Sequence, residues 1–154
     1  MDTEINLNGE PVSEVGLLSP LCIGPSTPIR EALLVLRAQH RGALLVCQDD
    51  ILVGILTERD VVRILVEGRD LSASIAEEMV EHPMTLRDGD SIALAIRRMA
   101  ENGYRRLPVV DDNDRPVGLL DVEGIVHFLV QHFPEAVYNL PPDGNLGTRE
   151  REGS

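Results

Sequence analysis

Aromatic residues are scarce in this chain of 154 residues, since they make up 3% of it and tryptophan is absent. The core must therefore come from the aliphatic part of the 43% of residues that are hydrophobic. Cys22 and Cys47, the 2 cysteines, lie in apolar stretches without the spacing of a metal site or a disulfide framework. We expect two buried, reduced thiols of the kind found in a cytoplasmic protein.

Positive charge is also scarce, because 14 Lys and Arg residues stand against 26 Asp and Glu residues, for a net charge of −12. This balance argues against a nucleic-acid backbone or an anionic membrane as the main partner, since both need clustered cations, but not against a small anionic ligand. No apolar run approaches the roughly 18 residues of a membrane-spanning helix. Residues 1–4 are acidic and do not resemble the start of a signal peptide, so we expect a cytoplasmic location.

Motifs for catalysis and metal binding are missing too. The 4 histidines form no ligand pattern, and the chain has no Ser/His/Asp set, no Cys/His set and no G-x-x-x-x-G-K phosphate loop. The acidic run 111–114 lacks the glycine and distal glutamate of a calcium loop, so a solvated hairpin turn explains it better. The sequence thus predicts no catalytic residue, no metal site and no required cofactor, and an enzyme is its weakest interpretation.

What the chain does contain is an internal repeat. A helix-like run that begins at Ile29 returns at Ile92 with the same spacing of its apolar positions. The strand-like segments that follow begin with Leu45 and its counterpart Val109, and these counterparts are one residue further apart in the sequence than those of the helix. An extra residue near positions 105–106 accounts for the change. Because only two copies occur, we expect two units that bury their apolar faces against each other rather than a solenoid.

Each copy has the pattern helix, strand, strand, helix. In the first copy, Thr27 and Pro28 fit the N-cap and first position of a helix, and Thr57 opens the second helix after two short apolar strands. The predicted units are a flexible N-terminal segment (1–14), a first repeat (15–68), a linker with a short helix (69–83), a second repeat (84–133) and a C-terminal extension (134–154) that is disordered after about residue 142.

This plan resembles the cystathionine-β-synthase (CBS) domain pair, or Bateman module, over roughly residues 15–133. The likeness is carried by TPIREA at 27–32, GILTERD at 54–60 and NGYRRLPVVD at 102–111. Each string is moderately specific, and their order in both copies strengthens them. The resemblance implies an α+β fold, a tandem pair of βαββα-type repeats packed through their sheets with pseudo-two-fold symmetry, and a flat homodimer of two such pairs.

The segment that points most directly to a ligand runs from Gly54 to Asp60. Thr57 and Asp60 lie three positions apart on one face of a helix start, beside free backbone N–H groups. Thr57 can meet a phosphate oxygen and Asp60 can accept from both ribose hydroxyls, and the resemblance implies this use for the adenosine part of AMP, ATP or related molecules.

The same spacing also fits a capping box, in which both side chains only satisfy the N–H groups of the helix start. The second copy acts as an internal control: it keeps a cap at Asp121 but has Gly124 where the first copy has Asp60. Folding of the unit therefore needs only the cap, which favours a ligand role for Asp60. We expect one good site per chain.

Several other residues are candidates for the same site. Arg105 and Arg106 precede a strand where the repeats should meet and suit a phosphate, and Arg41 holds a similar place in the first copy; the alternative is a surface salt bridge. Thr27 either touches the adenosine or is a plain helix cap, and Ile55 lines the base pocket or is simply core.

Together these features predict a stand-alone regulatory module that binds an AMP-, ADP- or ATP-type ligand between the repeats and signals by conformational change to a separate effector protein. The alternative is a ligand-independent dimerisation or scaffold protein with a degenerate site. An apolar run over residues 128–140 supports a homodimer. The predicted nucleotide-binding residues are Thr57, Asp60, Arg59, Ile55, Thr27, Arg41, Arg105 and Arg106.

Overall fold

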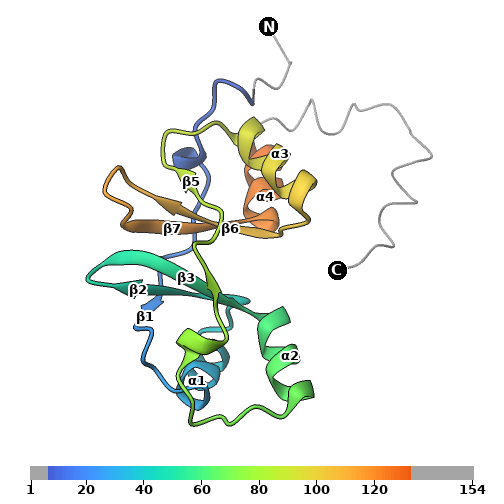
Figure 1. Cartoon of the computed structure of the whole chain (residues 1–154). Helices are drawn as coiled ribbons and strands as arrows, with labels where there is room; N and C mark the ends of the chain where they lie inside the picture. The colour runs from blue at the N-terminus through green and yellow to red at the C-terminus, as the bar shows by residue number, and fades with distance from the viewer. Residues whose placement is uncertain (1–6, 133–154) are drawn as a thin grey trace, which may run out of the picture.

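The computed structural model describes residues 7–132, in two halves that stack on each other (Figure 1). The first half holds β1 (Cys22–Ile23), α1 (Ile29–Gln39), β2 (Ala43–Gln48), β3 (Ile51–Thr57), α2 (Glu58–Glu67) and β4 (Val80–Glu81). The second holds β5 (Leu86–Arg87), α3 (Ile92–Asn102), β6 (Arg106–Val110), β7 (Pro116–Asp121) and α4 (Val122–His132). The predicted C-terminal extension, 134–154, lies outside the described residues.

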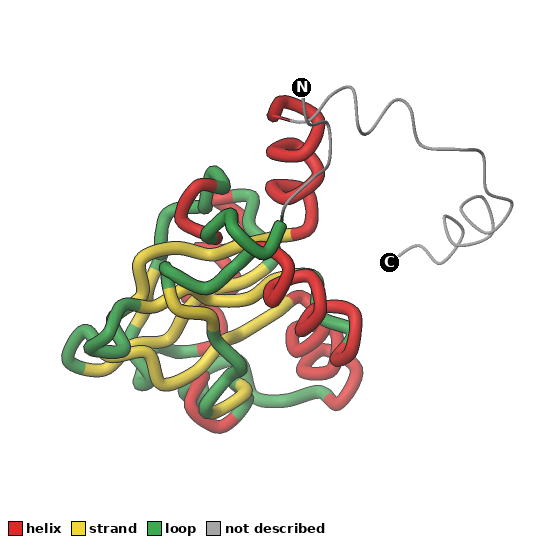
Figure 2. The backbone as a smooth tube through the Cα atoms, turned by 90° about the horizontal axis from the view of Figure 1, so that it is seen from above, coloured by secondary structure: helices red, strands yellow, loops and turns green. Residues whose placement is uncertain are grey.

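Two sheets face each other at the centre, in the strand orders β1-β2-β3-β4 and β5-β6-β7. The long helices lie on the outer sides of these sheets, and the view from above shows the strands in the middle of the molecule (Figures 1 and 2). Leu45 and Ile55 of one sheet share an apolar cluster with Leu119 of the other. The predicted α+β fold, with two βαββα repeats packed through their sheets, is confirmed.

Each helix that covers a sheet buries one apolar stripe. Ile29 and Leu36 of α1 are buried, as are their counterparts in α3, Ile92 and Met99. This amphipathic spacing is what the shared stripe predicted. Both helices end in the left-handed conformation, α1 at His40 and α3 at Gly103, which is a common helix C-cap.

The pairing of the hairpin strands corrects the alignment of the two copies. Ala43 pairs with Thr57 in the first hairpin, and Arg106 pairs with Asp121 in the second. Since Thr57 and Asp121 are counterparts, Ala43 corresponds to Arg106, in the same alignment that relates the helices α1 and α3. The extra residue therefore lies in the turn between β6 and β7, and its prediction near residues 105–106 was wrong.

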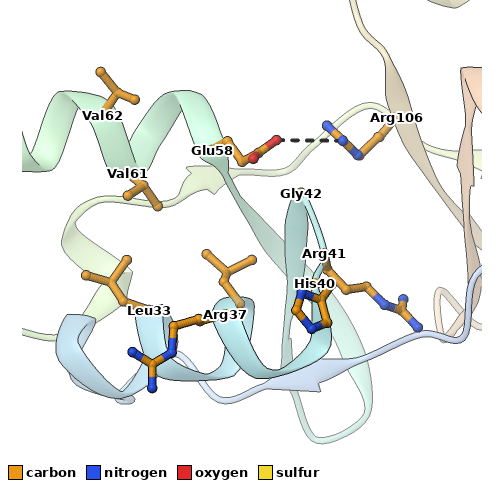
Figure 3. Close-up of a pocket in the computed structure, with 10 residues that line it drawn as sticks. Leu33, Arg37, His40, Arg41, Gly42, Glu58, Val61, Val62 and Arg106 are labelled. Carbon is orange, nitrogen blue, oxygen red and sulfur yellow. Dashed lines mark ion pairs between the residues drawn. The ribbon is translucent and has the colours of Figure 1, made fainter.

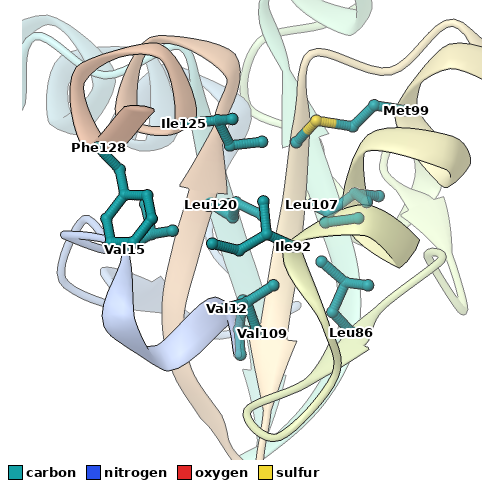
Figure 4. Close-up of a cluster of buried hydrophobic side chains, with 11 residues drawn as sticks. Val12, Val15, Leu86, Ile92, Met99, Leu107, Val109, Leu120, Ile125 and Phe128 are labelled. Carbon is teal, nitrogen blue, oxygen red and sulfur yellow. The ribbon is translucent and has the colours of Figure 1, made fainter. Parts of the chain in front are cut away.

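Part of the N-terminal segment belongs to the core of the second half. A short 3-10 helix at Val12–Glu14 buries Val12 completely, and Val15 is buried beside it. Figure 4 shows both side chains against the cluster that contains Phe128. The prediction of a flexible segment over residues 1–14 is therefore wrong for this stretch, because an isolated apolar residue among polar ones carries no periodic signal.

The linker between the repeats is likewise part of the first half. Its predicted short helix is a 3-10 turn at Ile75–Glu77, in which Ile75 is fully buried. The chain then runs through β4, which adds a fourth strand to the first sheet by pairing Val80 with Ile55. The linker thus reaches the face between the two halves.

Candidate functional site

The start of α2 forms the capping box that its sequence allows. The Thr57 N–H donates to Asp60 Oδ2 at 2.9 Å, and the Asp60 N–H is 3.4 Å from Thr57 Oγ1. The Thr57 hydroxyl also donates to Oδ2, at 3.0 Å. The cap therefore uses one oxygen of the nearly buried Asp60 carboxylate, while the other oxygen, Oδ1, faces the Arg63 guanidinium at 3.7 Å.

A small cavity lies between the two halves, and Ile55, two residues before Thr57, forms part of its wall. Its volume is about 110 Å³, well below the roughly 300–1,000 Å³ of a pocket that encloses a whole ligand. It can therefore take one flat ring system, with the rest of a ligand lying outside. The residues that line it are Ile55, Val80, Pro83, Met84, Tyr104, Arg106, Leu107 and Pro108.

Arg106 connects this cavity to the start of α2. Its guanidinium lies 3.7 Å from the Glu58 carboxylate (Figure 3), and Glu58 is the first residue of that helix. The same guanidinium occupies the space where a side chain at Gly42 would stand. A side chain at position 42 would therefore displace the guanidinium from its present position.

Two of the other predicted arginines, Arg41 and Arg105, do not line this cavity. Arg41 donates to the Ser19 carbonyl at 2.6 Å and to Ser19 Oγ at 2.7 Å. With the corrected alignment, Arg41 stands where the second copy has Tyr104, rather than Arg105, so an arginine held by Ser19 replaces an aromatic cavity residue. Arg105 is exposed and lines a separate small hollow beside Asp121.

Two further predicted residues lie apart from the cavity. Arg59 is exposed on α2. The helix α1 begins at Ile29 with Pro28 at its N-cap and no side-chain cap, so the predicted capping role of Thr27 is wrong. Instead, the Thr27 carbonyl accepts from the Ile75 N–H of the linker at 2.9 Å.

The second copy keeps the cap and lacks the distal carboxylate, as predicted. The Gly124 N–H donates to Asp121 Oδ1 at 2.7 Å, which satisfies the start of α4. The space beside Gly124 is bounded by Asp121, Val15 and the Gly16 carbonyl. The two helix starts therefore share a cap but differ in the presence of a carboxylate at the third helical position.

A larger groove, of about 710 Å³, runs between α1 and α2 and extends to Arg106 of the second half (Figure 3). Its walls are apolar at Leu33 and Val61, and the side chains of Arg37 and His40, from α1 and the following turn, also line it. Next to it α2 exposes Val66, whose surface is 80% accessible. Arg106 lines both this groove and the cavity between the halves, so the two openings adjoin at its ion pair with Glu58.

Two charged residues that the sequence did not single out complete the surroundings of Asp60. Arg63 donates to Glu78 Oε1 at 2.7 Å and to the Glu78 carbonyl at 2.8 Å. The hydrogen bond to Glu78 is the main cause of the raised pKa of Arg63, and the charge of Asp60 adds to it. Arg63 was detectable as a helix neighbour on the same face as Asp60, whereas nothing local marks Glu78.

The thiols differ from their predicted state. Cys22 is exposed and Cys47 is half-buried, so the expectation of two buried thiols is wrong for Cys22. The pKa of the Cys47 thiol is raised to about 12, mainly because the thiol is partly buried and secondly because it contacts Cys22. Over residues 7–132, no group of three or more His, Cys, Asp or Glu side chains is placed to hold a metal ion.

None of the helices in the described part of the chain has the length and apolar content that a bilayer crossing requires.

Comparison with known proteins gives two adjacent matches to one family. The CBS domain family matches residues 12–67 and again residues 73–131. The chain is 33% identical to inosine-5′-monophosphate dehydrogenase of Thermoplasma acidophilum over 114 residues, 74% of this chain and 22% of that enzyme. It is 28% identical to protein MK0525 of Methanopyrus kandleri over 118 residues, 75% of this chain. The chain spans only 60% of the length of MK0525.

Solved structures share the fold. The structure of CBSX2 in complex with AMP matches with a TM-score of 0.70 at 27% identity, over 80% of this chain and 98% of that one. The CBS domain pair of protein MJ0100, in complex with 5′-methylthioadenosine and S-adenosyl-L-methionine, matches with a TM-score of 0.71 at 24% identity. That match covers 77% of this chain and 98% of the other, and it supports the fold alone.

Proposed function

Because the chain belongs to the CBS domain family, with two copies of the domain that cover most of its length, we propose that it is a regulatory module that binds one adenosine-containing ligand per chain. The observation that carries the proposal is the start of α2. Its cap uses one oxygen of the buried Asp60 and leaves Oδ1 to the longer, 3.7 Å contact with Arg63. AMP in the related CBSX2 structure supports an AMP-type ligand.

Each part of the ligand contacts a different feature of the site. The adenine ring enters the small apolar cavity next to Ile55 and Tyr104, and the ribose hydroxyls donate to Asp60. The phosphate turns toward Arg106, which exchanges part of its 3.7 Å contact with Glu58 for a charge-assisted hydrogen bond. The second cleft stays without this ligand, because Gly124 offers no carboxylate.

The output is a change in the relative arrangement of the halves, and its size is limited by the ligand's preference for one arrangement. We infer that a separate effector protein reads this change and that the module itself is not catalytic. The free cysteines favour a cytoplasmic location. The alternative function, a ligand-independent scaffold, is favoured by the one fact that the capping box of α2 is complete without a ligand.

Calorimetric titration with AMP, ADP, ATP and S-adenosylmethionine tests the proposal. We expect one of them to bind at one molecule per chain, and to stabilise the fold by about 2.7 kcal/mol at a hundred times its Kd. If none of the four binds or raises the unfolding midpoint, the ligand proposal fails and the scaffold replaces it.

We further propose a homodimer formed through the helices of the first half. The groove between α1 and α2 is flanked by exposed apolar side chains, among them Leu34 and Val62, at 53% and 61% accessibility. An apolar patch of this kind on a surface helix pair suits a second copy of the same face, because a two-fold interface brings identical patches together.

Replacing Val62 by Glu is expected to raise the dimer dissociation constant at least about tenfold, because a carboxylate loses its hydration in the interface. Sedimentation velocity measures the effect. The control is Val117→Glu, the same change at an exposed valine of β7 away from these helices, which should leave the dimer intact. A wild-type chain that sediments as a monomer at micromolar concentration contradicts the dimer.

A further inference from the structure

The buried carboxylates of the described chain meet on a single guanidinium. Among residues 7–132, the buried charged side chains are Asp60 and Glu78, at 7% and 8% accessibility. Arg63 contacts both: its Nη2 is 3.7 Å from Asp60 Oδ1, and its Nη1 is 2.7 Å from Glu78 Oε1. Asp60 belongs to the candidate ligand site and Glu78 belongs to the linker, so Arg63 joins the two.

The part of the linker held by Arg63 forms one wall of the cavity. Arg63 also donates to the Glu78 backbone carbonyl at 2.8 Å, which fixes the main chain and not only the side chain. Shortly after Glu78, Val80 lines the cavity and pairs with Ile55 of the neighbouring strand. Between them, Met79 packs so closely on Gly54 that a Cβ there would lie 2.5 Å from the Met79 sulfur. A shift of the linker main chain is therefore transmitted to the cavity.

The second copy shows that this clamp is not needed to build the repeat. At the positions that correspond to Asp60 and Arg63, it has Gly124 and His127. The carboxylate and the guanidinium are both missing there, yet the cap at Asp121 persists and α4 forms. Arg63 therefore occurs together with the Asp60 carboxylate and is not needed for the fold of the repeat.

We propose that Arg63 is a positioning residue that couples occupation of Asp60 to the position of the linker; this inference rests on the proposed function. A ligand hydroxyl that donates to Asp60 Oδ1 takes over part of the negative charge that Arg63 now shares. Arg63 then relies more on Glu78, and the linker is held more firmly against α2. Ligand binding at one side chain thus alters the segment that connects the two repeats, which is what a change in their arrangement requires.

The test is hydrogen–deuterium exchange of the whole chain with and without AMP. The reporters are the amides of Glu78 and Met79, which donate to the Ile75 carbonyl at 2.9 and 2.8 Å and do not line the cavity. In the wild type we expect AMP to slow their exchange about fivefold or more, the lower range of allosteric coupling. In Arg63→Gln this slowing disappears, because AMP no longer binds the closed linker more tightly than the opened one.

The matched control is Arg69→Gln. Arg69 lies 3.7 Å from the Glu78 carboxylate and pairs with Glu67, and its ion pairs within the described chain do not include Asp60. The variant removes a charge from beside the same carboxylate, and should leave the slowing by AMP intact. If Arg63→Gln does not fold, Glu78→Gln takes its place, since it weakens the same clamp from the linker side with nearly unchanged shape.

The outcomes separate the two proposals. A wild-type chain that binds no adenosine ligand overturns both. A wild type that binds AMP, together with Arg63 or Glu78 variants that show the full slowing at Glu78 and Met79, overturns the coupling and leaves the binding site standing. Loss of the slowing in Arg69→Gln as well would also overturn the specific role of Arg63, because any weakening of the linker would then suffice.

Discussion

Replacing Asp60 by Asn is expected to weaken AMP binding by roughly 10- to 150-fold while the protein remains folded. A hydrogen bond to a charged group contributes about 1.5–3 kcal/mol, and the ribose hydroxyls lose their charged acceptor in this variant. The asparagine oxygen can still accept from the Thr57 N–H, which now lies 2.9 Å from Asp60 Oδ2, so most of the cap survives. Calorimetric titration of wild type and variant with AMP measures the loss.

A second variant separates ligand binding from helix capping. Ser91 caps α3 by accepting from the Leu94 N–H at 3.0 Å, in the second half and away from the cavity. Ser91→Ala should cost about 0.5–2 kcal/mol of stability, like other cap losses, and leave the affinity for AMP unchanged. If Asp60→Asn binds AMP as the wild type does, Asp60 is a capping residue only and the ligand must be held elsewhere.

The parts of the structure that could be predicted from the sequence depend on contacts between close neighbours in the chain. The capping box at Thr57 and Asp60 and the cap at Asp121 are each formed within the first turn of a helix, and their signal is therefore written in the local sequence. The apolar stripes of α1 and α3 are also local, and their repetition predicted two similar halves. The family resemblance then supplied how such halves pack, which the stripes alone do not determine.

The alignment of the two copies could not be settled from apolar positions. The strands β2 and β6 are largely continuous apolar runs, so a shift by one position still matches aliphatic with aliphatic side chains. The pairing of Arg106 with Asp121 shows that the extra residue belongs to the hairpin turn. The error mattered for function, because it matched Arg41 with Arg105 and hid its true counterpart, Tyr104.

The clamp on the linker was invisible for a different reason. Arg63 and Glu78 are far apart in the sequence and meet only when the linker folds back on α2. An arginine on a charged helix face and a glutamate in the acidic run Glu77–Glu78 ordinarily indicate solvated side chains. Glu78 is nevertheless buried, and no pattern in the local sequence predicts this burial. The same holds for Val12, whose partners in the core belong to the second repeat.

Replacing Val12 by Asp is therefore expected to destabilise the protein by about 3–5 kcal/mol, the usual cost of a buried charge without a partner. Val12 has no accessible surface and lies in the apolar cluster of the second half (Figure 4). Its N–H also donates to the Asp90 carbonyl at 2.8 Å, which holds the segment against the start of α3. The thermal midpoint should fall by about 6–20 °C for a chain of this size, as measured by scanning calorimetry.

The control is Ser13→Asp, the introduction of the same carboxylate at the next position, where the side chain is exposed. A change at an exposed position should alter the stability by no more than about 0.5 kcal/mol. If both variants unfold at the wild-type temperature, the N-terminal segment does not contribute to the core. If only Val12→Asp is destabilised, the second repeat needs residues from before the first, and the two copies cannot fold as separate units. Such interdependence is what a sensor requires, because a structural change in one half then alters the stability of the other half.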